Sequence, residues 1–202
     1  MRTIDGLPAN APDAARAIEK ADITVAEATG ELQDNPAIDA LGTASEMADQ
    51  PPLIALSAAV LVAGILTRRP LLARTGARML AAHFLATGMK SMVKHSVDRT
   101  RPHVLVEEGR YELSEGNGTD DTRLNSFPSG HTAGAVAVAE AVARSAPRFA
   151  WPARIWAASI AAIQIPRCSH YVSDIAVGAA IGMAGDRAVR MAERMATNAL
   201  RR

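Results

Sequence analysis

The sequence predicts an all-α fold, a helical bundle of about five core helices that crosses a membrane and follows an N-terminal helical extension. The first observation is composition: the 202 residues are 49% hydrophobic but only 3% aromatic. Apolar content of this kind, dominated by Ala, Val, Leu and Ile, favours helices over sheets. The second is a series of apolar segments separated by arginine-bearing joints. We therefore expect an acidic extension over residues 1–50, a main domain over 51–190 and a basic tail over 191–202.

The N-terminal extension is polar and acidic and carries two weak helix patterns. The second opens at Asn35–Pro36, where a good N-cap residue precedes a proline at the first helical position. Pro51 and Pro52 are expected to end it. The first twenty residues lack an apolar segment behind a basic start, so they do not predict a cleaved signal peptide.

Five apolar segments follow the extension. The first, LIALSAAVLVAGIL, has no charge but is shorter than the roughly 20 residues of a typical membrane-spanning helix. Each segment alone also fits an alanine-rich core helix of a soluble bundle, and the mean hydropathy of +0.04 supports that alternative. The segments are residues 53–66, 79–89, 132–142, 155–165 and 175–184.

The distribution of charge favours the membrane interpretation. If all five segments span, the intervening joints alternate between two faces, and the only acids on one face are Asp186 and Glu193. The opposite face receives the acidic extension and the loop 94–130, where acids outnumber bases. This asymmetry matches the positive-inside rule and predicts a multi-pass protein of the cytoplasmic membrane. The basic, cytoplasmic face would carry Arg68, Arg69, Arg74, Arg78, Arg144, Arg148, Arg154, Arg187, Arg190, Arg194, Arg201 and Arg202.

Composition also argues against several classes of partner and cofactor. The formal net charge is +1, and basic residues are not interleaved with aromatics, so no nucleic-acid partner is predicted. Cys168 is the only cysteine, which rules out an intrachain disulfide and a zinc site built on several thiolates. No carboxylate cluster suited to Mg²⁺ is evident, and no cofactor or metal is predicted. Nothing in the sequence indicates an oligomeric state.

The first chemically suggestive motif is KHSVDRTRP. Lys94 and Arg101 lie seven residues apart, about two helical turns, at the end of a helical pattern that Pro102 is expected to stop. On one helix face, an ammonium and a guanidinium suit a phosphate dianion, with Arg99 assisting from the side. The alternative is a basic run that complements the dipole at a helix C-terminus.

The second motif is FPSGH. Ser129 and Gly130 precede a predicted helix and would point a hydroxyl and backbone N–H groups at an anion near its N-terminus. His131 falls on the first turn, and a histidine there can donate a proton to a leaving oxygen. The alternative is an ordinary capping turn. The long irregular stretch before the motif is of a length that is often functional.

The third motif is PRCSHYVSD. His170 and Asp174 are four residues apart, one helical turn, so the carboxylate is expected to hold one imidazole nitrogen and leave the other to attack. Arg167 lies one turn before His170. Such a His–Asp spacing also occurs in ordinary surface pairs, so the ordered set of three motifs is the more specific signal.

Taken in order, K-x6-R-P, P-S-G-H and R-x-x-H-x3-D resemble the signature of type 2 phosphatidic acid phosphatases and the related vanadium haloperoxidases, over roughly residues 51–190. The resemblance implies that these residues form the catalytic domain. It implies that His170 is the nucleophile, Asp174 its orienting partner and His131 the general acid. It also implies a phosphate cradle made of Lys94, Arg101, Ser129 and Gly130.

The third motif departs from the family pattern in one position. The family usually places an arginine six residues before the nucleophilic histidine, where this chain has Gln164. Arg167 is three residues further on and would lie on nearly the same face of a helix. We therefore expect Arg167 to supply the missing phosphate contact.

The resemblance implies a metal-independent phosphatase, active in EDTA, that acts on a lipid-linked phosphate or diphosphate of the phosphatidic acid, phosphatidylglycerophosphate or polyprenyl diphosphate type. Its site would face the outside of the membrane, or the periplasm. The mechanism would be in-line attack by His170, with protonation of the leaving oxygen by His131 and hydrolysis of the phosphohistidine by water. Two alternatives remain: a catalytically impaired membrane protein that binds phospholipid headgroups, and a soluble acid phosphatase or haloperoxidase of the same fold.

Overall fold

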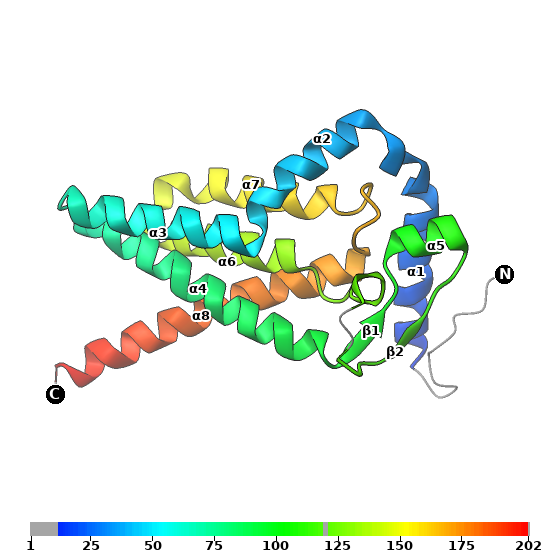
Figure 1. Ribbon diagram of the computed structural model, residues 1–202. Coiled ribbons are helices and arrows are strands. Elements are labelled where there is room, and N and C mark those ends of the chain that lie inside the picture. The colour runs from blue at the N-terminus through cyan, green and yellow to red at the C-terminus, as the bar shows by residue number, and fades with distance from the viewer. Residues whose placement is uncertain (1–11, 119–120, 202) are drawn as a thin grey trace. The chain divides into compact units, whose positions relative to one another are not determined.

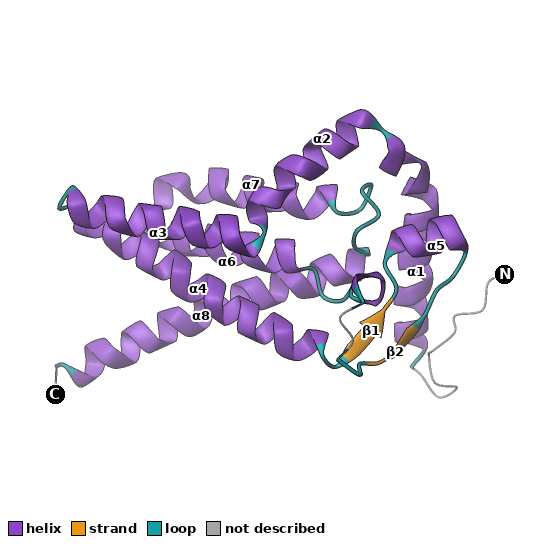
Figure 2. Cartoon of the chain, in the orientation of Figure 1, coloured by secondary structure: helices purple, strands orange, loops and turns teal. Residues whose placement is uncertain are grey.

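The computed structural model describes residues 12–118 and 121–201, so residues 1–11 of the predicted extension and Arg202 lie outside the described residues. Within those ranges the chain has eight α-helices and one two-stranded sheet, which confirms the all-α prediction (Figures 1 and 2). The described residues form two compact units. The first unit contains residues up to Ser45, Ser91–Ser129 and Ala161–Val177, and the second contains Glu46–Lys90, Gly130–Ile160 and the chain from Gly178.

Five helices correspond to the five predicted apolar segments. The last of them continues beyond residue 190, so no helix break separates the predicted basic tail from the segment before it. A short 3-10 turn, η2 (Glu46–Ala48), precedes the first of the five, and another, η4 (Pro147–Phe149), lies between the third and the fourth. The helices are α3 (Gln50–Leu66), α4 (Pro70–Lys94), α6 (Gly130–Ser145), α7 (Ala150–Ile163) and α8 (Val172–Ala199).

Helices of the second unit pack through small residues at close distance. A Cβ atom added to Gly182 on α8 would lie 2.6 Å from the carbonyl oxygen of Ala133 on α6. One added to Gly185 would lie 2.9 Å from the carbonyl oxygen of Ala82 on α4. Contacts of this kind need glycine on one helix and allow the backbones to approach closely, as in helix pairs inside membranes.

The exposed face of α3 carries large apolar side chains, whereas its buried face includes small and polar residues. Its buried residues are Leu53, Ser57 and Gly64, while Leu66 is 77% exposed and Leu56, Val62 and Ile65 are also exposed. Among the described residues, no single helix is long and apolar enough to count as a membrane span. The consecutive segments Pro36–Ala48 and Gln50–Leu66 pass that test only as a bent pair.

The first unit begins with α1 (Asp13–Thr29), the 3-10 turn η1 (Gly30–Asp34) and α2 (Pro36–Ser45). The predicted start of α2 is confirmed, because the side-chain oxygen of Asn35 accepts a hydrogen bond from the N–H of Ala37 at 2.9 Å. The predicted end at Pro51–Pro52 is wrong. The helix ends at Ser45, and the two prolines lie in the first turn of α3, where the N–H that proline lacks has no partner within the helix.

The segment around the first motif also differs from the prediction. Helix α4 ends at Lys94, and β1 (Val97–Arg99) then pairs antiparallel with β2 (Leu113–Glu115), with Asp98 opposite Ser114. Pro102 begins α5 (Pro102–Glu108) instead of ending a helix. Lys94 and Arg101 therefore do not lie two turns apart on one helix face, because cross-strand hydrogen bonds hold the residues between them in an extended conformation.

The core of the first unit contains two tyrosines. Tyr111 and Tyr171 pack edge to face, with ring centroids 5.9 Å apart, beside Ala26 of α1 and Leu105 of α5. This geometry is a favoured aromatic arrangement. The packing joins the N-terminal helix to the segments that carry the first and third motifs.

Candidate active site

His170 lies just before α8 and is only 4% exposed. Its Nδ1 atom is 2.7 Å from the backbone carbonyl oxygen of Ser126. A carbonyl oxygen only accepts hydrogen bonds, so Nδ1 must carry the proton, and the lone pair of the neutral ring is on Nε2. Nε2 has no hydrogen-bond partner within residues 12–118 and 121–201. The ring is thus held in the tautomer required for attack by Nε2.

Asp174 supports this arrangement less directly than expected. Its Oδ2 atom is 3.7 Å from Nδ1 of His170, which is too long for a hydrogen bond. Instead, Oδ2 accepts from the hydroxyl of Ser126 at 2.5 Å and from the N–H of Tyr171 at 2.8 Å. Asp174 therefore orients His170 chiefly through Ser126, and its charge acts on the ring across the remaining distance.

Sequence reasoning missed Ser126. Its side chain donates to Asp174, its carbonyl accepts from His170, and its own N–H donates to the carbonyl of Arg99 at 3.0 Å. The residue is fully buried. The only sequence signal was its position two residues before Pro128, directly upstream of the second motif.

Arg99 is the second residue whose role the sequence did not reveal. It is only 1% exposed, and Nη1 donates to Oδ1 of Asp174 at 2.5 Å. The prediction that Arg99 assists in phosphate binding is wrong, because protein acceptors surround its guanidinium. The guanidinium carbon, Cζ, also lies 4.1 Å from the ring centroid of Tyr171. Its further hydrogen-bond partners are Glu19 at 2.7 Å, Asp22 at 2.8 Å, Ser173 at 2.9 Å and Tyr111 at 3.1 Å.

Two of those partners come from the N-terminal helix. Glu19 and Asp22 are three residues apart on α1 and so face the same side. Asp22 also accepts hydrogen bonds from the backbone N–H of Ser173, at 3.1 Å, and from its hydroxyl. Tyr111 donates its hydroxyl to Glu19, and burial raises the pKa of Tyr111, which keeps it a donor. The extension thus supplies two carboxylates to the buried ion pair between Arg99 and Asp174.

The charges around His170 favour a neutral ring and an ionised Asp174. Burial lowers the pKa of His170, and the positive charge of Arg101 acts in the same direction. Burial alone would raise the pKa of Asp174, but the neighbouring His170 and Arg99 hold it below its ordinary value. At neutral pH the site therefore combines an uncharged imidazole with a carboxylate.

The predicted cationic residues of the first motif are both in the first unit. Arg101 occupies the N-cap position of α5. Its N–H donates to the carbonyl of Arg123 at 2.8 Å, and its Nε donates to the carbonyl of Thr122 at 2.9 Å. Its positive charge acts to lower the pKa of His170. Lys94 is the half-buried last residue of α4.

The second motif is joined to the third through the backbone. The N–H of Ser129 donates to the carbonyl oxygen of Asp174 at 3.1 Å. Helix α6 begins at Gly130, which confirms that Ser129 precedes a helix and that His131 lies in its first turn. Within the second unit, Nε2 of His131 is 3.3 Å from a carboxylate oxygen of Glu46, a contact the sequence did not predict.

Gln164 and Arg167 both contact α2. Nε2 of Gln164 donates to the hydroxyl of Ser45 at 3.2 Å, and Nη1 of Arg167 donates to the carbonyl of Gly42 at 3.1 Å. The backbone carbonyl of Gln164 also accepts from the N–H of His170, at 3.2 Å, and so helps form the turn that places the ring. The role of Arg167 as the replacement phosphate ligand stays a prediction.

A family model described as the PAP2 superfamily matches residues 75–195, which include all three motifs. The chain belongs to the PAP2 superfamily. Comparison with curated protein sequences gives no significant match.

Two solved structures have the same fold as this PAP2 chain. One is described as the first transmembrane PAP2 type phosphatidylglycerolphosphate phosphatase from Bacillus subtilis, with a TM-score of 0.65 and 19% identity over 89% of this chain and 87% of that one. The other is LpxE of Aquifex aeolicus, with a TM-score of 0.57 and 20% identity over 79% of this chain and 90% of that one. These similarities confirm the fold of the PAP2 chain.

Proposed function

We propose that this PAP2 protein hydrolyses a lipid-linked phosphate or diphosphate through a phosphohistidine on Nε2 of His170. One observation carries the proposal: the Ser126 carbonyl holds the Nδ1 proton at 2.7 Å, so the Nε2 lone pair is available in a ring that is neutral at neutral pH. A buried histidine fixed in this way is suited to nucleophilic attack.

In the first step the Nε2 lone pair forms a bond to phosphorus while the bond from phosphorus to the leaving oxygen breaks. The leaving oxygen keeps that electron pair and takes a proton from His131, and the lipid alcohol or lipid monophosphate departs. The phosphorylated ring carries a positive charge, which the carboxylate of Asp174, 3.7 Å from Nδ1, stabilises.

In the second step a water oxygen attacks phosphorus and the phosphorus–nitrogen bond breaks, returning its electron pair to Nε2. The now neutral His131 accepts the proton of the water. Inorganic phosphate leaves, and both histidines return to their starting states. We assign Lys94, Arg101 and Arg167 to the equatorial oxygens, where fixed cations are most useful in phosphoryl transfer.

The hydroxyl of Ser129 and the backbone N–H of Gly130 complete the proposed cradle. The N–H groups at the start of a helix have no partners within the helix and favour an anion. Residues 51–190 then form the catalytic domain, and residues 1–50 support it through Glu19 and Asp22, which bind Arg99.

We place the protein in the cytoplasmic membrane as a multi-pass protein, with the site on the outer or periplasmic side. The exposed apolar surface of α3, the glycine contacts of the second unit and the arginine-rich joints support this placement. The similar structure from Bacillus subtilis is that of a transmembrane phosphatase, which agrees with this placement. A lipid substrate would then present its phosphate at the headgroup level.

The test is phosphate release from a panel of lipid phosphates and diphosphates in detergent with EDTA. We expect wild type to release phosphate from at least one lipid and His170→Ala to release none. His95→Ala is the matched control, because that ring is exposed and its only described contact is with the carbonyl of Ser91. Equal release by wild type and His170→Ala would exclude the phosphohistidine mechanism.

A second candidate function rests on Gln164, which occupies the position where the family usually has an arginine and is fully buried beside Ser45. With a weakened cradle the chain would bind a phospholipid headgroup without hydrolysing it. In the same panel, lipid binding without release from any substrate by wild type would favour this candidate.

A further inference from the structure

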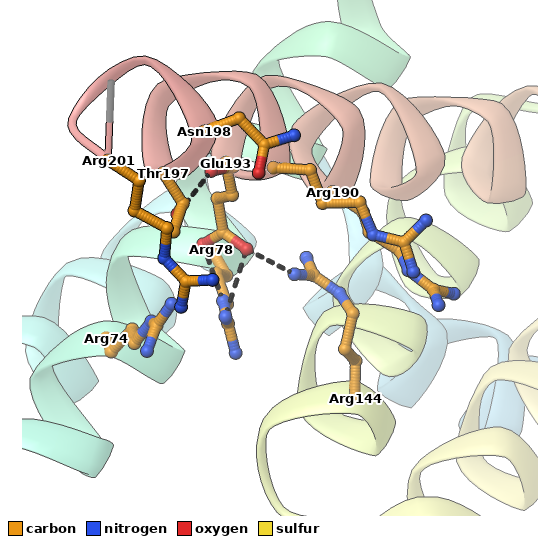
Figure 3. A pocket seen from close by; sticks show the side chains of 9 residues that line it. Arg74, Arg78, Arg144, Arg190, Glu193, Thr197, Asn198 and Arg201 are labelled. Carbon is orange, nitrogen blue, oxygen red and sulfur yellow. Dashed lines mark hydrogen bonds and ion pairs between the residues drawn. The ribbon is translucent and has the colours of Figure 1, made fainter.

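A pocket of about 310 Å³ in the second unit is lined by arginines from three helices (Figure 3). Its residues come from α4, the last turn of α6, the C-terminal half of α8 and the turn that follows α8, where Arg201 lies, and none belongs to the three catalytic motifs. In Figure 3 the side chains from α8 face those from α4 and α6 across the pocket. The lining residues are Arg74, Arg78, Arg144, Arg190, Glu193, Arg194, Thr197, Asn198 and Arg201.

The lining has a large excess of positive charge. Six arginines face one carboxylate, Glu193, and both of its oxygens are already engaged. Oε1 accepts from Nε of Arg78 at 2.7 Å, and Oε2 accepts from Nη1 of Arg144 at 2.8 Å. Arg144 also binds Asp186 at 2.7 Å. Glu193 therefore pairs with Arg78 and Arg144 and does not neutralise the other four arginines of the pocket.

Four arginines of the lining contact no carboxylate in the part of the chain that the structure describes. All four are exposed. Their helical spacing places like charges side by side, because Arg190 and Arg194 are one turn apart on α8 and Arg74 is one turn before Arg78 on α4. Like charges at this helical spacing repel. The four are Arg74, Arg190, Arg194 and Arg201.

We infer that this pocket is a second phosphate-binding site, separate from the proposed catalytic site. Guanidinium groups bind phosphate oxygens in pairs, and an anion with two or more charges would offset the repulsion among them. The volume is at the lower end of the range for small-ligand sites and fits a phosphate ester or a diphosphate. Asn198 adds a neutral amide group that can donate a further hydrogen bond.

The same chemistry is offered by the headgroup of an anionic phospholipid and by a free phosphate or diphosphate. The predicted topology puts these arginines on the cytoplasmic face, where both are present. The inference does not depend on the phosphatase activity, because it concerns binding at residues outside the three motifs.

The test compares wild type with Arg190→Gln/Arg194→Gln. These arginines contact no described carboxylate, so the double variant leaves the Arg78–Glu193–Arg144 contacts between helices intact. The matched control is Arg187→Gln, an exposed arginine of the same helix that does not line the pocket. Any anion binding at the catalytic motifs is common to all three proteins and cancels in the comparison.

The soluble arm measures inorganic pyrophosphate binding to the purified protein in detergent by calorimetry. The lipid arm counts phosphatidylglycerol molecules retained by the protein in native mass spectrometry, with phosphatidylcholine as the neutral comparison. We expect the double variant to weaken pyrophosphate binding at least about tenfold, or to lose one retained phosphatidylglycerol, while Arg187→Gln matches wild type.

Loss of binding by the double variant in both arms supports a site that recognises the phosphate group itself. Loss in the lipid arm alone assigns the site to a phospholipid headgroup, and loss in the soluble arm alone assigns it to a free phosphate. If the double variant equals wild type in both arms, or if Arg187→Gln causes the same loss, the inference is overturned in favour of diffuse surface charge. Matching thermal unfolding curves for the three proteins exclude misfolding as the cause of any loss.

Discussion

Ser126 accepts a hydrogen bond from Nδ1 of His170 through its backbone carbonyl, and its hydroxyl donates to Asp174. One residue thus connects the proposed nucleophile to the carboxylate that the sequence had paired with it directly. Because the carbonyl survives any substitution, the contribution of the side chain can be tested by itself.

Ser126→Ala removes the hydroxyl that holds Asp174 but keeps the carbonyl that holds His170. We expect kcat to fall by about tenfold, the worth of one hydrogen bond to a charged group, with KM little changed. Steady-state phosphate release measures it. Ser96→Ala is the control, since among the described residues that exposed hydroxyl donates only to the carbonyl of Met92. A loss as complete as that of His170→Ala would contradict this division of roles.

Asp22→Asn weakens the carboxylate cluster that binds Arg99. Because one partner of a buried ion pair is removed, we expect the free energy of unfolding to fall by about 3 kcal/mol. We also expect kcat to drop, since Arg99 holds Asp174. Thermal unfolding in detergent and kcat report the two effects. Glu31→Gln, at an exposed position after α1, should change neither.

The pH profile of kcat/KM should show an acidic limb below the ordinary pKa of a histidine, because burial and Arg101 lower the pKa of His170 and only the neutral ring attacks. Arg101→Gln removes a positive charge that opposes protonation. The pKa of His170 then rises, and the acidic limb moves to higher pH whatever the loss in rate. A shift to lower pH would show that the limb belongs to another group.

Arg167→Gln tests the proposed replacement for the arginine that the family has at position 164. If Arg167 contacts phosphate, kcat/KM should fall by roughly tenfold to a hundredfold. Arg110→Gln, which removes an exposed arginine paired with Glu112, should leave the value unchanged. No change in Arg167→Gln would limit the role of this arginine to its contact with Gly42 on α2.

Gly182→Ala should destabilise the second unit by about 1–3 kcal/mol, because its Cβ would lie 2.6 Å from the carbonyl oxygen of Ala133. Gly88→Ala is the opposite case. Nothing lies within 4 Å of its added Cβ, so the better helix propensity of alanine should leave stability unchanged or raise it by up to about 1 kcal/mol. Thermal unfolding of both variants in detergent distinguishes packing from propensity.

Much of the fold could be predicted because it depends on local patterns. The apolar segments locate α3, α4, α6, α7 and α8, and the Asn35–Pro36 pair gives the start of α2. The same local rules misplaced the segment around Lys94. A helix was expected through Arg101, but pairing of β1 with β2, a contact between residues about 16 apart, overrides the helical pattern.

The sequence by itself determined which residue types are available for chemistry and their order: His170, Asp174, His131 and the cations of the first motif. Only the tertiary structure decided how they are connected. The contacts of Ser126 with His170 and of Arg99 with Asp22 join residues 44 and 77 positions apart. Such contacts form because buried polar groups must find partners, and which partners they find depends on how the chain folds, not on local spacing.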